Sequence, residues 1–172
     1  LRQPDHYCSL DTTLSMAAKA FSAAKKIDLE THPKKLLGIA VTASLATNYT
    51  KKGDHKFFIA IQTHKYSASY SYSFIKGELS RDEEEKVVTK HIIHAISDAC
   101  GIKETFVNES PNLIFEKVAA EKPWIKLVNN KIDFVSSSNR SPELIFPGSF
   151  NPFHSGHSEM SELAEKRTGL SP

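Results

Sequence analysis

Three segments in the first half of the chain carry the hydrophobic patterns of β-strands. Residues 36–42 form a continuous apolar run, which predicts a central strand that is buried on both faces. Residues 55–63 form a second apolar run, and residues 65–75 alternate between serines and tyrosine, alanine or phenylalanine. We expect the alternating strand to pair with the strand before it and to turn its tyrosines under a helix.

Two segments carry the three- or four-residue period of amphipathic helices. The first spans about residues 9–26, where a polar residue such as Ser9 can cap the helix. The second spans residues 80–100, and Ser80 and Glu83 have the spacing of a capping box. The acidic residues after Ser80 suit the positive end of the helix dipole, so we expect a solvated helix start rather than a catalytic carboxylate pair.

The second half of the chain gives weaker signals. Residues 113–120 fit either a short helix or a strand. Residues 124–128 and 132–135 predict two short strands joined by a turn at two asparagines, with Trp124 in the core. Residues 136–142 are rich in Ser, Asn and Arg, which indicates a linker between two domains.

Composition and charge limit the class of protein. The length of 172 residues suits one medium domain and part of another, and 40% hydrophobic with 24% charged residues is ordinary for a globular protein. A net charge of +2 with scattered lysines does not demand nucleic acid or an anionic membrane. Cys8 and Cys100 lie far apart without metal-ligand spacing, so we expect free thiols in a reducing compartment, the cytoplasm. No apolar run reaches the roughly 18 residues of a membrane span.

Two features of the first half suggest chemistry without defining it. His91 and His94 are three residues apart on the second helix, but no carboxylate or cysteine supports a metal site at a suitable spacing. We therefore expect surface or hydrogen-bonded histidines. Residues 43–54 form a loop dense in hydroxyl groups after a strand, which is where ligands collect in α/β sheets. A plain solvated loop is the alternative.

The most specific motif is LIFPGSFNPFHSGH, at residues 144–157. Its apolar start predicts a short buried strand, Pro-Gly-Ser predicts a turn, and His154 opens a helix. A strand, a glycine-containing turn and a helix N-terminus place backbone N–H groups and the helix dipole toward an anion such as phosphate. His154 and His157 at that terminus can donate hydrogen bonds to phosphate oxygens as negative charge builds up.

This motif resembles the signature of the HxGH nucleotidyltransferases, most closely those that adenylylate nicotinamide or nicotinate mononucleotide. The resemblance implies that Gly148, Ser149 and Phe150 cradle a triphosphate and that His154 and His157 stabilise its α-phosphate during in-line attack. It also implies ATP or CTP as substrate, with Mg²⁺ sharing the phosphate charge. Only 15 residues follow His157, so we expect an internal piece of a longer enzyme that does not catalyse the transfer alone.

Residues 7–102 resemble the later two-thirds of the CinA C-terminal domain, the nicotinamide-mononucleotide deamidase family. The similar segments are YCSLDTTLSMAAKA, GIAVTASLAT, GDHKFFIAIQT and FIKGELSRDEEEKV, in that order. The resemblance implies a mixed sheet flanked by helices and a mononucleotide site that includes Thr42, Ser44 and Arg81. The family's serine nucleophile, lysine and tyrosine would precede Leu1, and the sequence ties no base to Ser44.

Together these features predict an α/β protein with a CinA-like domain over residues 1–138. The first β-α unit of a Rossmann-like nucleotidyltransferase domain would follow over residues 139–172. The leading hypothesis is transfer of a nucleotidyl group to a phosphate-bearing acceptor, a pyridine mononucleotide, in NAD biosynthesis. The alternatives are an amidohydrolase acting on nicotinamide mononucleotide, and a non-catalytic module that binds a mononucleotide or forms a dimer. The predicted partners are small nucleotides and a second copy of the CinA-like domain, not nucleic acid or a membrane.

Overall fold

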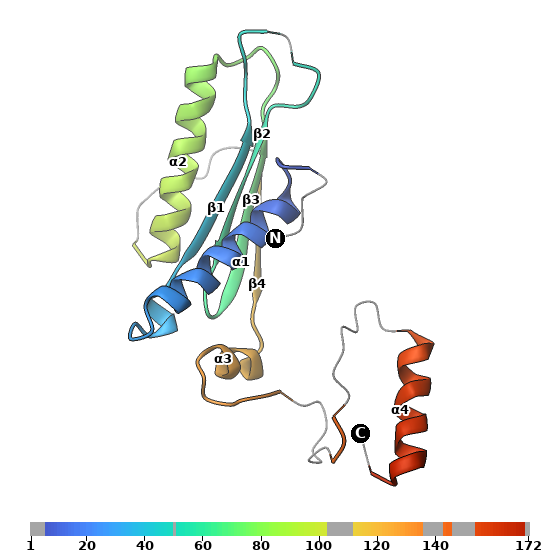
Figure 1. Cartoon of the computed structure of the whole chain (residues 1–172). Coiled ribbons are helices and arrows are strands. Elements are labelled where there is room, and N and C mark those ends of the chain that lie inside the picture. Colours follow the sequence, from blue (N-terminus) through green and yellow to red (C-terminus); the bar gives the residue numbers. More distant parts are fainter. Residues whose placement is uncertain (1–5, 50, 103–111, 136–142, 146–153, 171–172) are drawn as a thin grey trace. The chain divides into compact units, whose positions relative to one another are not determined.

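The chain forms two compact units, Leu1–Asp133 and Phe134–Pro172. The computed structural model describes residues 6–49, 51–102, 112–135, 143–145 and 154–170. Figure 1 shows the helices and strands of both units along the chain. No helix in these described segments is long and apolar enough to cross a membrane.

A four-stranded sheet in the order β1-β2-β3-β4 forms the centre of unit 1 (Figure 1). Its strands are β1 (Gly38–Ser44), β2 (Lys56–Gln62), β3 (Tyr66–Ser73) and β4 (Leu113–Ala119). The three strands expected in the first half are confirmed, and the ambiguous segment at residues 113–120 is a strand. The α/β class is also confirmed.

Two expectations about the sheet are wrong for the described residues. All three strand pairings are antiparallel, so the described sheet is not mixed. β1 lies at the sheet edge rather than in its centre. Residues 36–41 are nevertheless all apolar, because helices cover both faces of the sheet.

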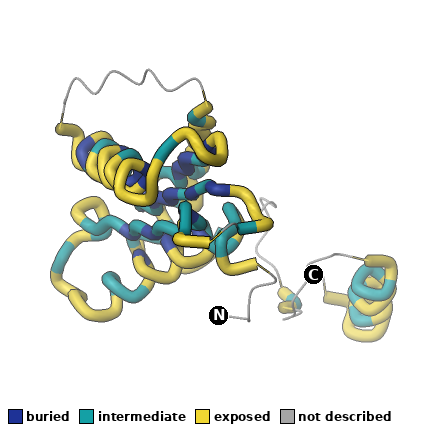
Figure 2. The backbone as a smooth tube through the Cα atoms, turned by 90° about the horizontal axis from the view of Figure 1, so that it is seen from above, coloured by how far each residue is buried: buried dark blue, intermediate teal, exposed yellow. Residues whose placement is uncertain are grey.

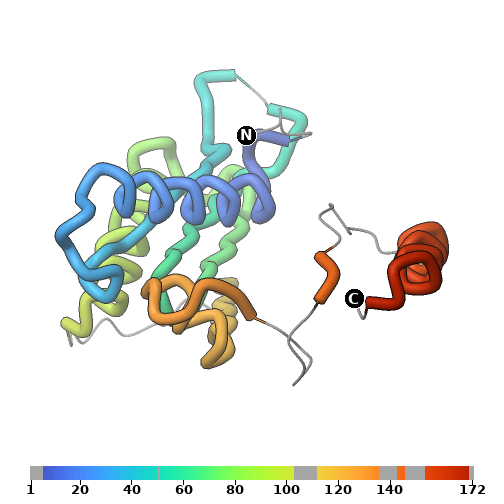
Figure 3. The backbone as a smooth tube through the Cα atoms, turned by 60° about the horizontal axis from the view of Figure 1, so that its bottom comes forward, coloured from blue at the N-terminus to red at the C-terminus, as the bar shows by residue number. Residues whose placement is uncertain are grey.

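Helices α1 (Leu10–Ile27) and α2 (Arg81–Ala99) cover opposite faces of this sheet (Figures 1 and 3). The Ser9 hydroxyl accepts a hydrogen bond from the backbone N–H of Thr12 at 3.2 Å and caps α1. Ser80 and Glu83 form the expected capping box at the start of α2. Gly101 follows α2 with φ 72°, a left-handed conformation that suits glycine.

Buried positions gather in the sheet and on the helices where they meet it (Figure 2). Alternating residues of β2 supply the two faces of the core. Phe57, Ile59 and Ile61 point toward α2 and pack with the tyrosine face of β3, as expected. Ala60 points the other way and packs with small residues of α1 and β1. The α2 side therefore holds the large side chains, while small side chains let α1 approach the sheet closely.

Gly38 lies where α1 approaches the sheet most closely. A Cβ added at Gly38 would lie 2.2 Å from the carbonyl oxygen of Ala17 and 2.6 Å from the backbone nitrogen of Phe21. We expect Gly38→Ala to lower the free energy of unfolding by about 1–3 kcal/mol, because the backbone of α1 must shift. Gly53→Ala is the matched control, since a Cβ there meets nothing within 4 Å. Equal unfolding midpoints for the two variants in urea would contradict this close approach.

Tyr70 is buried in the α2 side of the core. Burial raises the pKa of its hydroxyl to about 12, and Asp98 adds to the rise. The unfolded chain has the ordinary pKa of about 10. As pH rises from about 10 to 12, the unfolded state therefore loses this proton first, and the protein loses stability across that window. Urea unfolding should show a smaller loss over this window for Tyr70→Phe; an equal loss would contradict the raised pKa.

Two strands expected after β4 are absent from the described structure. Residues 124–128 belong to helix α3 (Lys122–Val128), and residues 132–135 form bends and irregular backbone. Pro123 lies in the first turn of α3, where its fixed φ favours a helix start. Trp124 is 52% exposed rather than in the core. The asparagine turn is present, with Asn130 at φ 54°.

Unit 2 contains helix α4 (Ser155–Thr168), which ends at Gly169 in the left-handed conformation with φ 69°. The predicted helix after His154 is therefore confirmed. The strand predicted before it is wrong at Leu144 and Ile145, which lie in a bend and irregular backbone, and Ile145 is 79% exposed. Phe146, the third residue of that predicted strand, lies outside the described residues.

Candidate functional site

The two motif histidines lie together at the start of α4. His154 is the N-cap residue, and His157 follows three residues later. Their rings stack with 3.8 Å between centroids and 28° between planes. The backbone N–H of His154 donates to Nδ1 of His157 at 3.3 Å, and the backbone N–H of His157 donates to the carbonyl oxygen of His154 at 3.0 Å. A hydrogen bond thus holds the imidazole of His157 at the helix N-terminus, and the His154 ring stacks on it.

The ring of His154 packs closely against Gly156. A Cβ at Gly156 would lie 3.2 Å from both Nδ1 and Cε1 of His154. A side chain at this position would therefore require the His154 ring to shift by a few tenths of an ångström. This close approach gives a physical reason for the glycine in the His-Ser-Gly-His spacing.

The hydrogen bond at Nδ1 of His157 determines which atom can act on a ligand. Because Nδ1 accepts a hydrogen bond, the neutral ring carries its proton on Nε2, which is then a donor. The first turn of α4 carries no acidic residue that would oppose an anion. The start of α4 therefore combines imidazole donors with the positive end of a helix dipole. Gly148, Ser149 and Phe150, the expected triphosphate cradle, lie outside the described residues.

The three site residues predicted in unit 1 occupy different surroundings. The Thr42 hydroxyl lies 2.7 Å from that of buried Thr13, between β1 and α1. Ser44 lines a hollow of about 500 Å³ beside the N-terminal end of α1. Arg81 lines a second hollow of about 760 Å³ at the start of α2. The structure therefore does not bring Thr42, Ser44 and Arg81 into one hollow.

Ser44 has a neighbour that the sequence did not indicate. Nζ of Lys51 donates to the Ser44 hydroxyl oxygen at 2.7 Å, and the Ser44 hydroxyl donates to the carbonyl oxygen of Asp54 at 3.1 Å. The loop after β1 therefore folds back and places Lys51 and Asp54 beside the last residue of the strand. A serine hydroxyl beside a lysine amine is a known arrangement for a nucleophile and its base.

Glu84 is a buried residue that the sequence analysis placed in a solvated helix start. It is 0% exposed, and its carboxylate contacts Nδ1 of His55 at 2.8 Å and the backbone N–H of Ala46 at 2.6 Å. The expectation of a solvated acidic run is therefore wrong at this residue. Its spacing of four from Val88 places it on the buried stripe of α2, and that signal was present in the sequence.

His91 of α2 is hydrogen-bonded within its own helix. Nδ1 of His91 lies 2.8 Å from the carbonyl oxygen of Val87, and its ring packs on Phe57. This confirms the expectation of a hydrogen-bonded histidine. The described segments hold no group of three or more His, Cys, Asp or Glu side chains that could bind a metal. Cys8 and Cys100 are free thiols, as expected.

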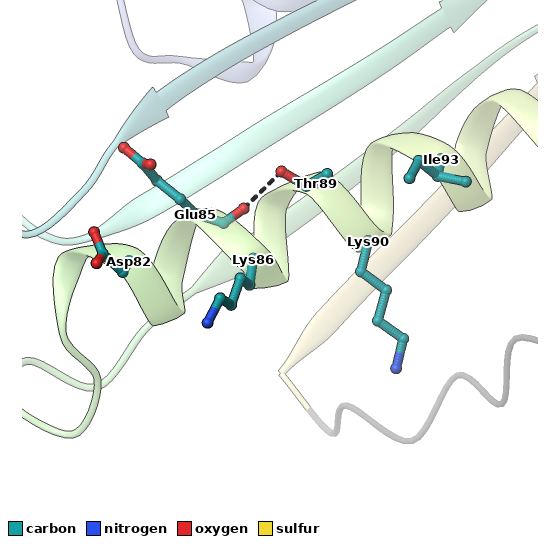
Figure 4. A pocket seen from close by; sticks show the side chains of 6 residues that line it. All are labelled: Asp82, Glu85, Lys86, Thr89, Lys90 and Ile93. Atoms are coloured by element: carbon teal, nitrogen blue, oxygen red, sulfur yellow. Dashed lines mark hydrogen bonds between the residues drawn. The ribbon is translucent and has the colours of Figure 1, made fainter.

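The exposed face of α2 carries a shallow depression of about 570 Å³ (Figure 4). Its lining comes from this one helix and mixes both signs of charge, with Asp82 and Glu85 beside Lys86 and Lys90. Figure 4 shows the two lysines extending away from the helix rather than converging on one point. This surface therefore has the character of an ordinary solvated helix face.

Comparison with known proteins adds no relative. No protein-family model, no curated protein and no solved structure matches this chain. Function must therefore be inferred from the geometry of the histidine pair in unit 2 and of the loop after β1 in unit 1.

Proposed function

We propose that the protein transfers a nucleotidyl group from ATP or CTP to a phosphate-bearing acceptor, a pyridine mononucleotide. The observation that carries this proposal is the stacked pair of His154 and His157 over the first turn of α4, at 3.8 Å between ring centroids. A helix N-terminus with two imidazoles suits the binding of phosphate oxygens. The spacing of the two histidines around Gly156 supports the HxGH resemblance. The position of this motif after the CinA-like segment in the chain supports a role in cytoplasmic NAD biosynthesis.

In this reaction an oxygen of the acceptor phosphate attacks the α-phosphorus of the nucleoside triphosphate. The bond from that phosphorus to the bridging oxygen of the β-phosphate breaks, and pyrophosphate leaves. Negative charge builds on the α-phosphate oxygens, where Nε2–H of His157 donates a hydrogen bond. The N-terminus of α4 adds its positive dipole at the same place. Catalysis is then positioning plus charge stabilisation, without a covalent enzyme intermediate.

Mg²⁺ is the metal that the resemblance implies for this reaction. Mg²⁺ binds such nucleotides through phosphate oxygens, usually with few protein ligands. The described residues offer no cluster of three or more metal-ligating side chains. We therefore assign no step of the proposed mechanism to a metal ligand of this chain.

The test is a pyrophosphate-release assay of the full-length protein with ATP or CTP as donor and nicotinamide or nicotinate mononucleotide as acceptor. The proposal predicts pyrophosphate and a dinucleotide in equal amounts with one donor–acceptor pair. Pyrophosphate without a dinucleotide would indicate hydrolysis only. No product from any pair would remove nucleotidyl transfer as the function.

A second candidate is amide hydrolysis of nicotinamide mononucleotide by unit 1. Nζ of Lys51 lies 2.7 Å from the Ser44 hydroxyl oxygen, which favours this activity. Nζ of Lys51, once deprotonated, would take the Ser44 hydroxyl proton as Ser44 attacks the amide carbon, and would pass that proton to the leaving nitrogen, which departs as ammonia. Water would then cleave the acyl-enzyme. Ammonia release that disappears in Ser44→Ala would support this candidate. Mononucleotide binding without ammonia release would leave unit 1 a non-catalytic binding module.

A further inference from the structure

Unit 1 carries Ser44 on the wall of the hollow of about 500 Å³ beside the N-terminal end of α1. This volume lies within the range of small-molecule sites. Tyr7, Leu10 and Phe58 give apolar surface to the part of the wall that the structure describes. A hollow of this kind suits the apolar part of a ligand, with the serine hydroxyl as a polar group at its edge.

The charges on the described wall of this hollow are few and of opposite sign. Lys56 brings one ammonium, Asp54 brings one carboxylate, and His6 adds an imidazole. Lys56 is the direct partner of Ser44 in the pairing of β1 with β2, so the two side chains lie on the same face of the sheet. A phosphate dianion is bound by several cations together, and the described wall offers one lysine. The lining therefore favours a neutral ligand over a mononucleotide.

The hydroxyl of Ser44 is held between two partners from the loop after β1. Nζ of Lys51 donates to Oγ of Ser44 at 2.7 Å, and the hydroxyl donates to the carbonyl oxygen of Asp54 at 3.1 Å. Lys51 lines the neighbouring hollow of about 760 Å³, whereas Ser44 lines the hollow of about 500 Å³. The lysine amine therefore reaches Oγ from one side, while a ligand can reach it from the other. A nucleophilic serine needs this arrangement of base and substrate.

Contacts from other segments support the backbone that carries Lys51. Nζ of Lys76 donates to the carbonyl oxygens of Lys51 and Lys52 at 3.2 and 2.9 Å. Buried Glu84 accepts a hydrogen bond from the backbone N–H of Ala46, near the start of the same loop, at 2.6 Å. The amine is therefore placed beside Ser44 by a supported loop, which lowers the entropy cost of holding the base in position.

We propose that Ser44 and Lys51 hydrolyse a neutral carboxylic ester whose small apolar acyl group binds in the hollow of about 500 Å³. This inference rests on the serine–lysine pair of the second candidate function but assigns it a different substrate, and it does not depend on nucleotidyl transfer. An ester suits the pair better than an amide, because an alcohol oxygen leaves more readily than an amide nitrogen, which needs a stronger acid to protonate it.

The reaction proceeds through an acyl-serine. Nζ of Lys51, in its uncharged form, takes the hydroxyl proton as Oγ of Ser44 attacks the carbonyl carbon of the ester. The bond from that carbon to the alcohol oxygen breaks, and Lys51 gives the proton to this oxygen, so the alcohol leaves. Water then attacks the acyl carbon and gives a proton to Lys51. The bond from the acyl carbon to Oγ breaks, Oγ regains the proton, and the carboxylic acid leaves. The ammonium of Lys56 favours the negative carbonyl oxygen that forms in both steps.

The test is hydrolysis of 4-nitrophenyl butyrate by the whole chain, followed by the release of nitrophenol. We expect saturable turnover and a higher kcat/KM than for the hemisuccinate of the same phenol, whose acyl group is negatively charged. Absence of turnover, or an equal kcat/KM for the two esters, would overturn the proposal. Ammonia release from nicotinamide mononucleotide without ester hydrolysis would also overturn it but would keep the amidohydrolase candidate. Ester hydrolysis without ammonia release would support this inference alone.

Substitutions of the pair assign the hydrolysis to Ser44. Ser44→Ala and Lys51→Met should each lower kcat by about 10²-fold or more, the usual effect of losing a nucleophile or its base. Lys51→Arg keeps the positive charge but cannot give up a proton, so it should be equally inactive. Activity restored by arginine would show that Lys51 contributes only charge or structure. Lys52→Met is the matched control, since this exposed neighbour should leave kcat unchanged.

Covalent labelling gives a result that does not depend on the folding of any variant. A fluorophosphonate, which bonds to an activated serine and releases fluoride, should modify Ser44 and not Ser73, an exposed serine at the end of β3. Peptide mass spectrometry locates the label, and equal labelling of both serines would overturn the activation of Ser44. Cys8 lines the same hollow, so Cys8→Ser should keep the ester hydrolysis. Its loss in this variant would move the nucleophile to the thiol and overturn the proposal.

Discussion

Replacing His157 by alanine in the full-length protein is expected to lower the turnover number of nucleotidyl transfer by about 10²–10³, equivalent to about 2.7–4 kcal/mol. The variant loses the Nε2–H donor that the hydrogen bond at Nδ1 orients at the start of α4. Because this donor acts on charge that develops during the reaction, the loss should fall on kcat more than on KM. Steady-state kinetics with the productive donor and acceptor measure both values.

Glu159→Gln is the matched control for this substitution. Glu159 lies two residues further along α4 and is exposed, so its replacement should leave kcat nearly unchanged. The free energy of unfolding should change by less than about 1 kcal/mol in His157→Ala, since the side chain is only half-buried. A large loss of stability together with unchanged kcat would show that His157 is structural and not catalytic.

Replacing Glu84 by alanine is expected to destabilise unit 1 by about 1–3 kcal/mol for each partner that is left without its acceptor. The variant leaves Nδ1 of His55 and the backbone N–H of Ala46 without their acceptor. Both ends of the loop of residues 45–54 then lose their connection to α2. Urea unfolding monitored by circular dichroism measures the effect.

Glu85→Ala is the control for this prediction, because it also removes one negative charge from α2 but removes no buried contact. Glu85 is the next residue of α2, and its side chain pairs with Arg81 while remaining 52% exposed. Exposed pairs of this kind contribute about 0–1 kcal/mol, so this variant should unfold close to wild type. If Glu84→Ala and Glu85→Ala lose equal stability, the buried contacts of Glu84 do not hold the loop.

The sequence predicted the elements whose signals are local. The capping box of Ser80 and Glu83 and the serine alternation of β3 each determine the backbone over a few residues, and the structure has both. The helix after His154 was also predictable, because polar helix formers follow the motif and Gly169 ends it. Local periodicity and end signals therefore sufficed for most of unit 1 and for α4.

The errors arose where tertiary context decides the outcome. The apolar run of β1 indicates a strand that is buried on both faces. An edge strand that lies between two helices has the same apolar pattern as a central strand, so the sequence could not distinguish them. Residues 124–128 are too few for hydrophobic periodicity to distinguish a strand from a helix. Pro123 favours the helix, because its fixed φ suits the first turn. The contacts of Glu84 with His55 and of Lys51 with Ser44 depend on loop closure, which sequence spacing does not show.

The most direct test of the central claim is calorimetric titration of this chain with Mg–ATP, repeated with His154→Ala and His157→Ala. The claim is that the stacked histidines at the start of α4 hold the phosphates of a nucleoside triphosphate. It predicts saturable binding by the wild-type chain and a loss of at least about tenfold in affinity for either variant. Binding that is unchanged in both variants would contradict the claim and would move the nucleotide site away from α4.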